Sequence, residues 1–297
     1  MIFVQIRAKL TGLLTFALAL CYCAYAYGRL NPLNTLVFFV SMAAFELSIT
    51  GFNNYMDSRK NPEMLPFSRR LSLGLLIIFW AVAVIFGVIL VFNTDAVVLA
   101  CGAACFFTGT VYSFGPVPIS HTPLGELFSG VFEGFFILLL VVYINAPPDS
   151  LIGFSWNAGA PRMVFYLLPL AGLALLSAPC VACVANIMLA NNICDIEKDE
   201  LSGRHTLPCY LGKKRSLRLF AALYYAAFAA EILAAACGVV PAYALFALFA
   251  LFFVQRNITA FFRAQDKSTT FLRSINNMVW IILPLTACVG AAAIMRL

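Results

Sequence analysis

Residues 71–92 read LSLGLLIIFWAVAVIFGVILVF, and this stretch decides the fold. It holds no charged side chain, and it is long enough to cross a bilayer as a helix, which takes about 20 apolar residues. Strands of a membrane β-barrel would be shorter and would alternate apolar with polar residues. Similar runs recur along the 297 residues, of which 63% are hydrophobic and 11% charged. Soluble domains carry about a quarter charged residues, so the composition predicts an all-α membrane protein.

Nine apolar segments predict nine transmembrane helices in a single domain, residues 1–297. The segments lie near residues 10–27, 33–52, 71–92, 95–113, 124–144, 164–192, 217–238, 241–255 and 276–295. The sixth is too long for one crossing and contains Pro169 and Pro179, so we expect a tilt, a kink or an extension beyond the membrane. The first lacks a signal-peptide cleavage site followed by a polar chain, so we expect it to be a spanning helix.

The positive charges predict the orientation. With the N-terminus in the cytoplasm, sixteen of the nineteen Lys and Arg residues fall on the cytoplasmic side, as the positive-inside rule requires. The basic net charge then reflects topology and attraction to membrane lipid, and it requires no nucleic-acid partner. The polar segments 53–70, 193–216 and 256–273 lie on the same side. We therefore expect a reactive site that faces the cytoplasm from a bacterial inner membrane.

Two of these polar segments begin alike. Residues 53–61 read NNYMDSRKN, and residues 191–199 read NNICDIEKD. Residues four apart share one face of a helix. The pattern therefore predicts two helical rows of oxygen ligands: Asn53, Asp57 and Asn61 in the first, and Asn191, Asp195 and Asp199 in the second.

Such rows suit magnesium bound together with a diphosphate. Magnesium is usually held by a few carboxylates, phosphate oxygens and water. Basic side chains near the two rows would neutralise the remaining phosphate charge, namely Arg59, Lys60, Lys198 and Arg204. The alternative is a pair of ordinary polar helix ends at a membrane surface. A single copy would favour that alternative, whereas two copies on one side of the membrane favour a site.

These motifs resemble those of the UbiA-type family of intramembrane aromatic prenyltransferases. Asp195 and Asp199 match the family's Asp-x-x-x-Asp second motif, which follows the sixth span, and residues 203–207 and 211–212 are also similar to the family. The resemblance implies nine transmembrane helices, Mg²⁺, an isoprenyl diphosphate and an aromatic acceptor. It implies that the catalytic acids are Asp57, Asp195 and Asp199.

A finer resemblance concerns the acceptor. Residues 112–118, YSFGPVP, followed by Leu-Gly-Glu at 124–126, are similar to the branch that prenylates 1,4-dihydroxy-2-naphthoate in menaquinone synthesis. This similarity implies that Tyr112 and Glu126 contact substrate and that the product is a demethylmenaquinone. Other branches more often carry a lysine where this chain has Pro116.

The first motif departs from the family pattern. Asn54 stands where the family usually has Asp, and the distal residue is Asn61 or the displaced Glu63. We therefore expect a lopsided site in which the second motif binds more of the metal. The expected metal ligands are Asn53, Asp57, Glu63, Asp195 and Asp199. Asn53, Asn54 and Asn191 are expected to contact substrate as well.

Two further ionisable residues, Glu46 and Lys9, are candidate substrate contacts. Glu46 lies two helical turns before Asn53, inside the membrane, where a functional role is the default for an acid. It would line the acceptor cavity or serve as a hydrogen-bonded structural acid. Lys9 would contact the substrate anion or anchor the topology. The pair Cys180-x-x-Cys183 lacks a second polar pair, so we expect no zinc or redox role.

Two other functions remain as alternatives. A transporter would place its acids near the bilayer midplane on broken helices, whereas these acids are expected at the membrane surface. A phospholipid-headgroup transferase would concentrate its acids in a single motif of the form Asp-Gly-x-x-Ala-Arg, which this sequence lacks. A prenyltransferase with another aromatic or lipid acceptor is the remaining alternative.

Overall fold

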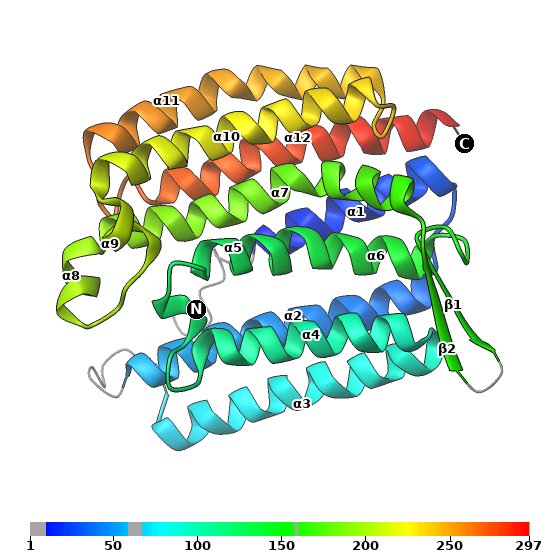
Figure 1. Cartoon of the computed structure of the whole chain (residues 1–297), viewed down its shortest axis with the longest axis horizontal. Helices are drawn as coiled ribbons and strands as arrows, with labels where there is room; N and C mark the ends of the chain where they lie inside the picture. The colour runs from blue at the N-terminus through cyan, green and yellow to red at the C-terminus, as the bar shows by residue number, and fades with distance from the viewer. Residues whose placement is uncertain (1–9, 59–66, 158–159, 297) are drawn as a thin grey trace.

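The computed structural model describes residues 10–58, 67–157 and 160–296, apart from the side chains of Asp57 and Asn157. Within these ranges nine helical segments are long and apolar enough to cross a membrane (Figure 1). Seven of them are single helices, and the first six of these are α1 (Leu10–Tyr27), α2 (Pro32–Asp57), α3 (Arg69–Asn93), α4 (Ala96–Ser113), α7 (Leu167–Cys194) and α10 (Lys213–Ala236). The ninth, α12 (Leu272–Arg296), is also a single helix.

The fifth and eighth segments are composite. The fifth span, Gly125–Asn145, consists of α5 (Gly125–Ser129), the π-helix η4 (Gly130–Phe136) and α6 (Ile137–Asn145). The eighth consists of the 3₁₀-helix η5 (Ala242–Phe249) and α11 (Ala250–Arg263). Short helices join the spans: η3 (Ile119–His121), α8 (Ile196–Leu201) and α9 (Leu207–Leu211).

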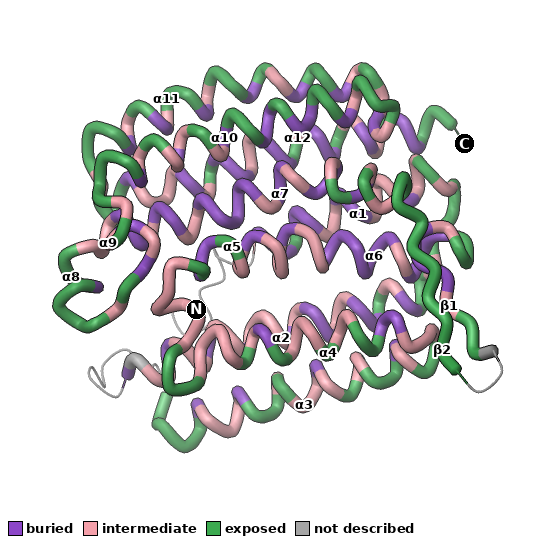
Figure 2. Tube along the Cα trace, in the orientation of Figure 1, coloured by how far each residue is buried: buried purple, intermediate pink, exposed green. Residues whose placement is uncertain are grey.

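The helices form two groups that meet at the fifth span. Figure 1 shows α2, α3 and α4 on one side of it and α7, α10, α11 and α12 on the other. Helix α1 packs against both α12 and the fifth span. Buried residues concentrate on α7, α6 and α1, whereas α3 is largely exposed (Figure 2). The exposed residues of α3 include Ile77, Trp80 and Ile85, as expected for a helix that faces lipid.

The predicted bundle of nine membrane helices is confirmed among the described residues, with one addition. Strands β1 (Ile152–Asn157) and β2 (Ala160–Phe165) form an antiparallel hairpin between the fifth span and α7. The sequence prediction assigned Val164 and Phe165 to the sixth helix because they continue its apolar run. They pair instead with Gly153 and Ile152, and the helix begins at Leu167. β-Branched and aromatic residues favour strands, and apolarity alone does not separate the two states.

Two glycines bring the fifth span close to α7. A Cβ added at Gly134 would lie 2.5 Å from the Val181 backbone nitrogen, and one added at Gly130 would lie 2.8 Å from the Val181 carbonyl oxygen. Glycines four residues apart allow two membrane helices to approach until their backbones touch. This contact fixes the position of Glu126, which begins the fifth span, relative to the end of α7.

Replacing Gly134 by alanine is expected to destabilise the protein by about 1–3 kcal/mol, because the added methyl group overpacks a backbone contact that cannot yield. Gly102→Ala in α4 is the matched control, because no heavy atom lies within 4 Å of its added Cβ. Denaturant unfolding of both variants in the same detergent measures the difference. Equal stability of the two variants would contradict the close approach of the fifth span to α7.

Candidate functional site

Residues 53–58 of the first duplicated segment and residues 191–199, the second, lie at the same end of the bundle, which we call the motif end (Figure 1). Helix α2 ends at Asp57, and the Ser58 backbone N–H caps it by donating to the Asn54 carbonyl oxygen. Several predicted residues of the first half lie outside the described ranges: Lys9, Arg59, Lys60, Asn61 and Glu63. Asn54 is buried and Asn53 is half-buried. Arg69 holds this end in place by stacking on the Tyr55 ring at 4.4 Å.

The second segment does not form one continuous helical row, so that prediction is wrong. Helix α7 ends at Cys194, and Asp195, with φ −111° and ψ 10°, joins it to α8. Asp is a poor residue for a helix interior and favours helix ends. The Asp199 N–H donates to the Asp195 carbonyl oxygen at 2.8 Å, which closes the first turn of α8. Asp199 therefore lies on a short helix of its own.

Asp199 is the more buried of the two second-motif acids, at 4% exposure. Thr206 donates to its Oδ2 at 3.3 Å, and the Arg204 N–H donates to its carbonyl oxygen at 2.9 Å. Burial raises the pKa of Asp199, and the nearby charge of Asp195 raises it further, while Arg204 opposes the shift. A cation bound between the two carboxylates would relieve this repulsion.

Lys267 supplies a positive charge that sequence reasoning did not assign to the site. Its ammonium group forms an ion pair with the Asp195 carboxylate. Lys267 lies in the turn between α11 and α12, 72 residues from Asp195 along the chain. The sequence placed it on the correct side of the bundle, in the polar segment 256–273. Nothing in the local sequence indicated which acid it contacts.

Glu126 and the second segment come together. The Asn192 side-chain amide donates to Glu126 Oε1 at 2.9 Å, and both residues are buried. Glu126 Oε2 is also buried, and it has no hydrogen-bond partner among the described residues. Tyr112 reaches the fifth span from α4, and its hydroxyl oxygen accepts at 2.9 Å from Ser129, which lies about one helical turn from Glu126. The implied substrate residues Tyr112 and Glu126 therefore share one neighbourhood with Asn192.

Two further acids face α1. Glu133 Oε2 accepts from Thr11 at 2.9 Å, and a Cβ added at Gly12 would collide with the Glu46 carboxylate. Both acids therefore meet the first turn of α1 inside the membrane-spanning region. Lys198 lies exposed on α8, and Asn191 is half-buried, with its amide donating to the Asn192 side chain at 3.4 Å.

The described donors fit a cation that is shared with an anionic ligand. Within the described ranges, no three His, Cys, Asp or Glu side chains gather as a ready metal cage. Two carboxylates, Asp195 and Asp199, with phosphate oxygens and water completing the coordination shell, are a normal arrangement for magnesium. The Asp57 side chain lies outside the described part of the chain.

Comparisons with known proteins show which family the chain resembles. Residues 13–294 match the UbiA prenyltransferase family. Over 217 residues the chain is 25% identical to 1,4-dihydroxy-2-naphthoate octaprenyltransferase of Bacillus subtilis (strain 168), and the alignment covers 69% of this chain and 63% of that protein.

Two solved structures share the fold. One comes from a study of digeranylgeranylglyceryl phosphate synthase in membranes, with a TM-score of 0.66, 16% identity and coverage of 98% of each chain. The other is a UbiA homolog from Aeropyrum pernix K1, with a TM-score of 0.63, 16% identity, and coverage of 95% of this chain and 97% of that one. The family match spans nearly the whole chain, and the chain belongs to the UbiA prenyltransferase family.

Proposed function

We propose that the protein is a magnesium-dependent transferase that moves a polyprenyl group from an isoprenyl diphosphate to an aromatic acceptor. The observation that carries the proposal is the pair Asp195 and Asp199, placed with Arg204 and Lys267 at one end of a membrane bundle. An isoprenyl diphosphate needs charged groups around its anionic head and an apolar environment around its hydrocarbon tail. The family match supports this function over the transporter alternative.

The acceptor in this proposal is 1,4-dihydroxy-2-naphthoate, which loses its carboxylate as CO2 when the prenyl group is attached, and the product is the quinol form of a demethylmenaquinone. The Bacillus subtilis relative supports this choice by its name, and so does the segment from Tyr112 to Glu126. The site would face the cytoplasm from a bacterial inner membrane, with residues 1–297 as one domain. Offering 1,4-dihydroxy-2-naphthoate, hydroxybenzoate and homogentisate in parallel tests the acceptor. A preference for either of the last two would overturn the acceptor while leaving prenyl transfer in place.

The chain's own residues have distinct tasks in this mechanism. Asp195 and Asp199 hold the cation, which when bound supplies charge stabilisation to the departing diphosphate. Arg204 and Lys267 donate to phosphate oxygens, for which the guanidinium group of Arg204 is well shaped. The apolar spans exclude water from the allylic cation that forms when the diphosphate leaves, so the electron-rich acceptor ring attacks it in place of water.

We propose that the first motif contributes less to binding the cation than the second motif does. Asp57 is its one certain carboxylate, and it would bind the cation together with Asn53 and Glu63. The remaining proposed substrate contacts are Lys9, Glu46, Asn54, Arg59, Lys60, Asn191 and Lys198.

Asn192→Ala is expected to lower kcat about 10–100-fold, because Asn192 positions Glu126, a proposed substrate contact, through a hydrogen bond to a charged group, which contributes about 1.5–3 kcal/mol. The change frees Glu126 Oε1 and removes the link between the fifth span and the end of α7. Glu126→Gln should be milder, because the glutamine carbonyl oxygen still accepts from Asn192. Steady-state kinetics with magnesium titrations measure both variants. A purely structural bond would lower the unfolding temperature of Asn192→Ala and leave its kcat unchanged, which would contradict the positioning role.

Lys267→Met is expected to raise the KM for prenyl diphosphate about tenfold, because one charge-assisted hydrogen bond contributes about 1.5–3 kcal/mol. The matched control is Lys214→Met, which removes an exposed lysine at the start of α10 and should leave the KM unchanged. Initial rates at varied diphosphate concentration measure both. An unchanged KM in Lys267→Met would show that this lysine serves Asp195 alone.

A further inference from the structure

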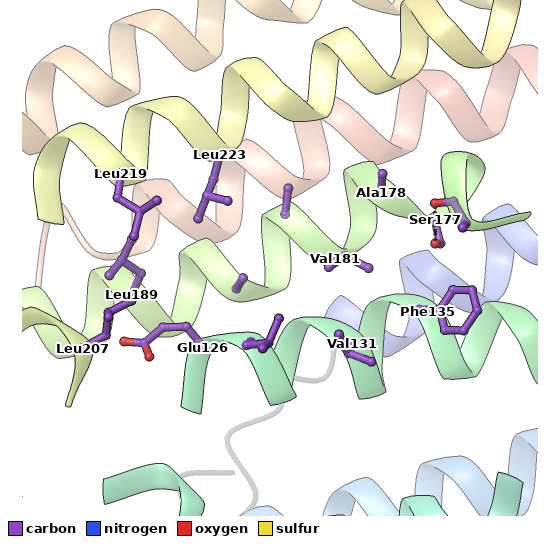
Figure 3. A pocket seen from close by; sticks show the side chains of 14 residues that line it. Glu126, Val131, Phe135, Ser177, Ala178, Val181, Leu189, Leu207, Leu219 and Leu223 are labelled. Atoms are coloured by element: carbon purple, nitrogen blue, oxygen red, sulfur yellow. Dashed lines mark hydrogen bonds between the residues drawn. The ribbon is translucent and has the colours of Figure 1, made fainter. Parts of the chain in front are cut away.

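An apolar groove lies where the fifth span, α7 and α10 meet (Figure 3). Its volume is about 560 Å³, within the usual range of sites that bind small molecules. Val131 and Phe135 line it from the fifth span, and Leu219 and Leu223 line it from α10. Leu127 beside them is 56% exposed, so the groove opens on the outer, lipid-facing surface of the bundle.

The floor of the groove is one face of α7. Ala174, Ala178 and Ala182 follow each other at intervals of four residues and therefore lie in one row. From Ala174 to Leu189, which also lines the groove, the helix rises about 22 Å at 1.5 Å per residue. That length is a large part of the hydrocarbon thickness of a bilayer, about 30 Å. The small side chains leave room for an extended chain to lie along the helix.

Glu126 closes the groove at the motif end (Figure 3). Asn192 satisfies its Oε1, while its Oε2 is buried without a hydrogen-bond partner in the described part of the chain. Leaving such an oxygen unpaired is unfavourable, because the loss of its hydration is not compensated. The other polar lining residue, Ser177, already donates to the Ala174 carbonyl oxygen at 2.9 Å. The groove therefore has one hydrogen-bond acceptor without a donor, Glu126 Oε2, at the motif end and apolar side chains along its length.

The free acceptor and the apolar lining together indicate which kind of ligand the groove binds. A carboxylate oxygen repels a diphosphate head, because both are anionic, but it accepts a hydrogen bond from a hydroxyl group. The fitting ligand thus has a hydroxyl-bearing head and a long hydrocarbon tail. A prenylated hydroxyaromatic, the product class of the proposed reaction, has both parts.

We infer that the groove between the fifth span, α7 and α10 binds the prenylated hydroxyaromatic product and leads it from the motif end into the membrane. The inference rests on the proposed function and adds the route by which the product leaves. Glu126 holds the head of the product, and the alanine row of α7 carries its tail. The groove is separate from the acids that receive the diphosphate, so product departs by a surface that the substrate head does not use.

Filling the groove tests the inference. Ala178→Phe and Ala174→Phe place a ring on the groove floor, and Ala171→Phe adds the same ring at an exposed position of α7 outside the groove. With a long prenyl diphosphate, the groove variants should form the first equivalent of product at the normal rate. Their steady-state rate should then fall about tenfold, because product release becomes limiting. The control should keep both rates, and a short prenyl diphosphate should restore turnover in the groove variants.

Two results would overturn the route: equal steady-state rates in Ala178→Phe and Ala171→Phe, or a slower first turnover in Ala178→Phe, which would make the groove a substrate path. If the unaltered protein forms no product at all, the proposed function fails, and the route fails with it. A photoreactive phenylalanine at position 178 gives a readout without turnover. It should capture a radiolabelled prenylated hydroxyaromatic more efficiently than the same group at position 171, and equal capture would overturn the site.

Discussion

Asp199→Asn is expected to lower kcat/KM for prenyl transfer at least about 100-fold, the scale of losing one preorganised electrostatic contact to a reacting group. Asparagine keeps the shape of the side chain and can still accept from Thr206, whose bond to Asp199 Oδ2 is 3.3 Å. What it removes is the charge that repels Asp195 and attracts a cation. Initial rates at saturating and at limiting magnesium measure the change, and added magnesium should recover only part of the loss.

Glu200→Gln is the matched control for this change. Glu200 is the next residue on α8, and its side chain is exposed, so the substitution removes the same charge from the same helix. We expect its kcat/KM to stay within about twofold, because exposed charges are screened by solvent and salt. Comparable losses in Glu200→Gln and Asp199→Asn would mean that activity depends on the net charge at the motif end and would contradict a specific cation-binding role of Asp199.

Chelation of divalent metal is expected to lower activity about 1,000-fold, and added magnesium should restore it. Without a cation, the diphosphate would have to bind beside Asp195 and Asp199. One pair of like charges at 4 Å costs about 4 kcal/mol at an effective dielectric constant of 20. A penalty of that size corresponds to about three orders of magnitude in binding. Activity in EDTA, followed by titration of magnesium, gives the measurement.

The control for chelation is the stability of the fold, measured in the presence of EDTA. Within the described residues the bundle is held by helix packing and has no metal cage, so its unfolding temperature should not change in EDTA. Full activity of the metal-free protein would contradict the proposed role of the two aspartates. Loss of both activity and fold would instead show a structural metal.

The bundle could be predicted from the sequence because length and apolarity suffice to identify a membrane span. The hairpin could not, since Val164 and Phe165 are as apolar as the helix that follows and differ only in being paired with β1. The close contact at Gly130 and Gly134 could have been predicted from the sequence, because two small residues four apart are typical of a helix interface.

The candidate site stays a prediction, but the sequence did single out its residues. Asp195 and Asp199 stood out because the motif repeats, and Glu126 stood out through a resemblance in the segment before the fifth span. The break of the helix at Asp195 was missed, because spacing cannot reveal whether two helices or one carry a row. Lys267 was missed because its contact with Asp195 depends on the packing of the α11–α12 turn against the end of α7.

The most direct test of the account measures product. Purified protein in lipid nanodiscs is given farnesyl or longer prenyl diphosphate, 1,4-dihydroxy-2-naphthoate and magnesium, and the prenylated naphthoquinol is identified by its mass. The account predicts that product and free diphosphate form in equal amounts, and that Asp195→Ala, which removes the carboxylate paired with Lys267, nearly abolishes both. Equal product from the intact protein and Asp195→Ala would contradict it.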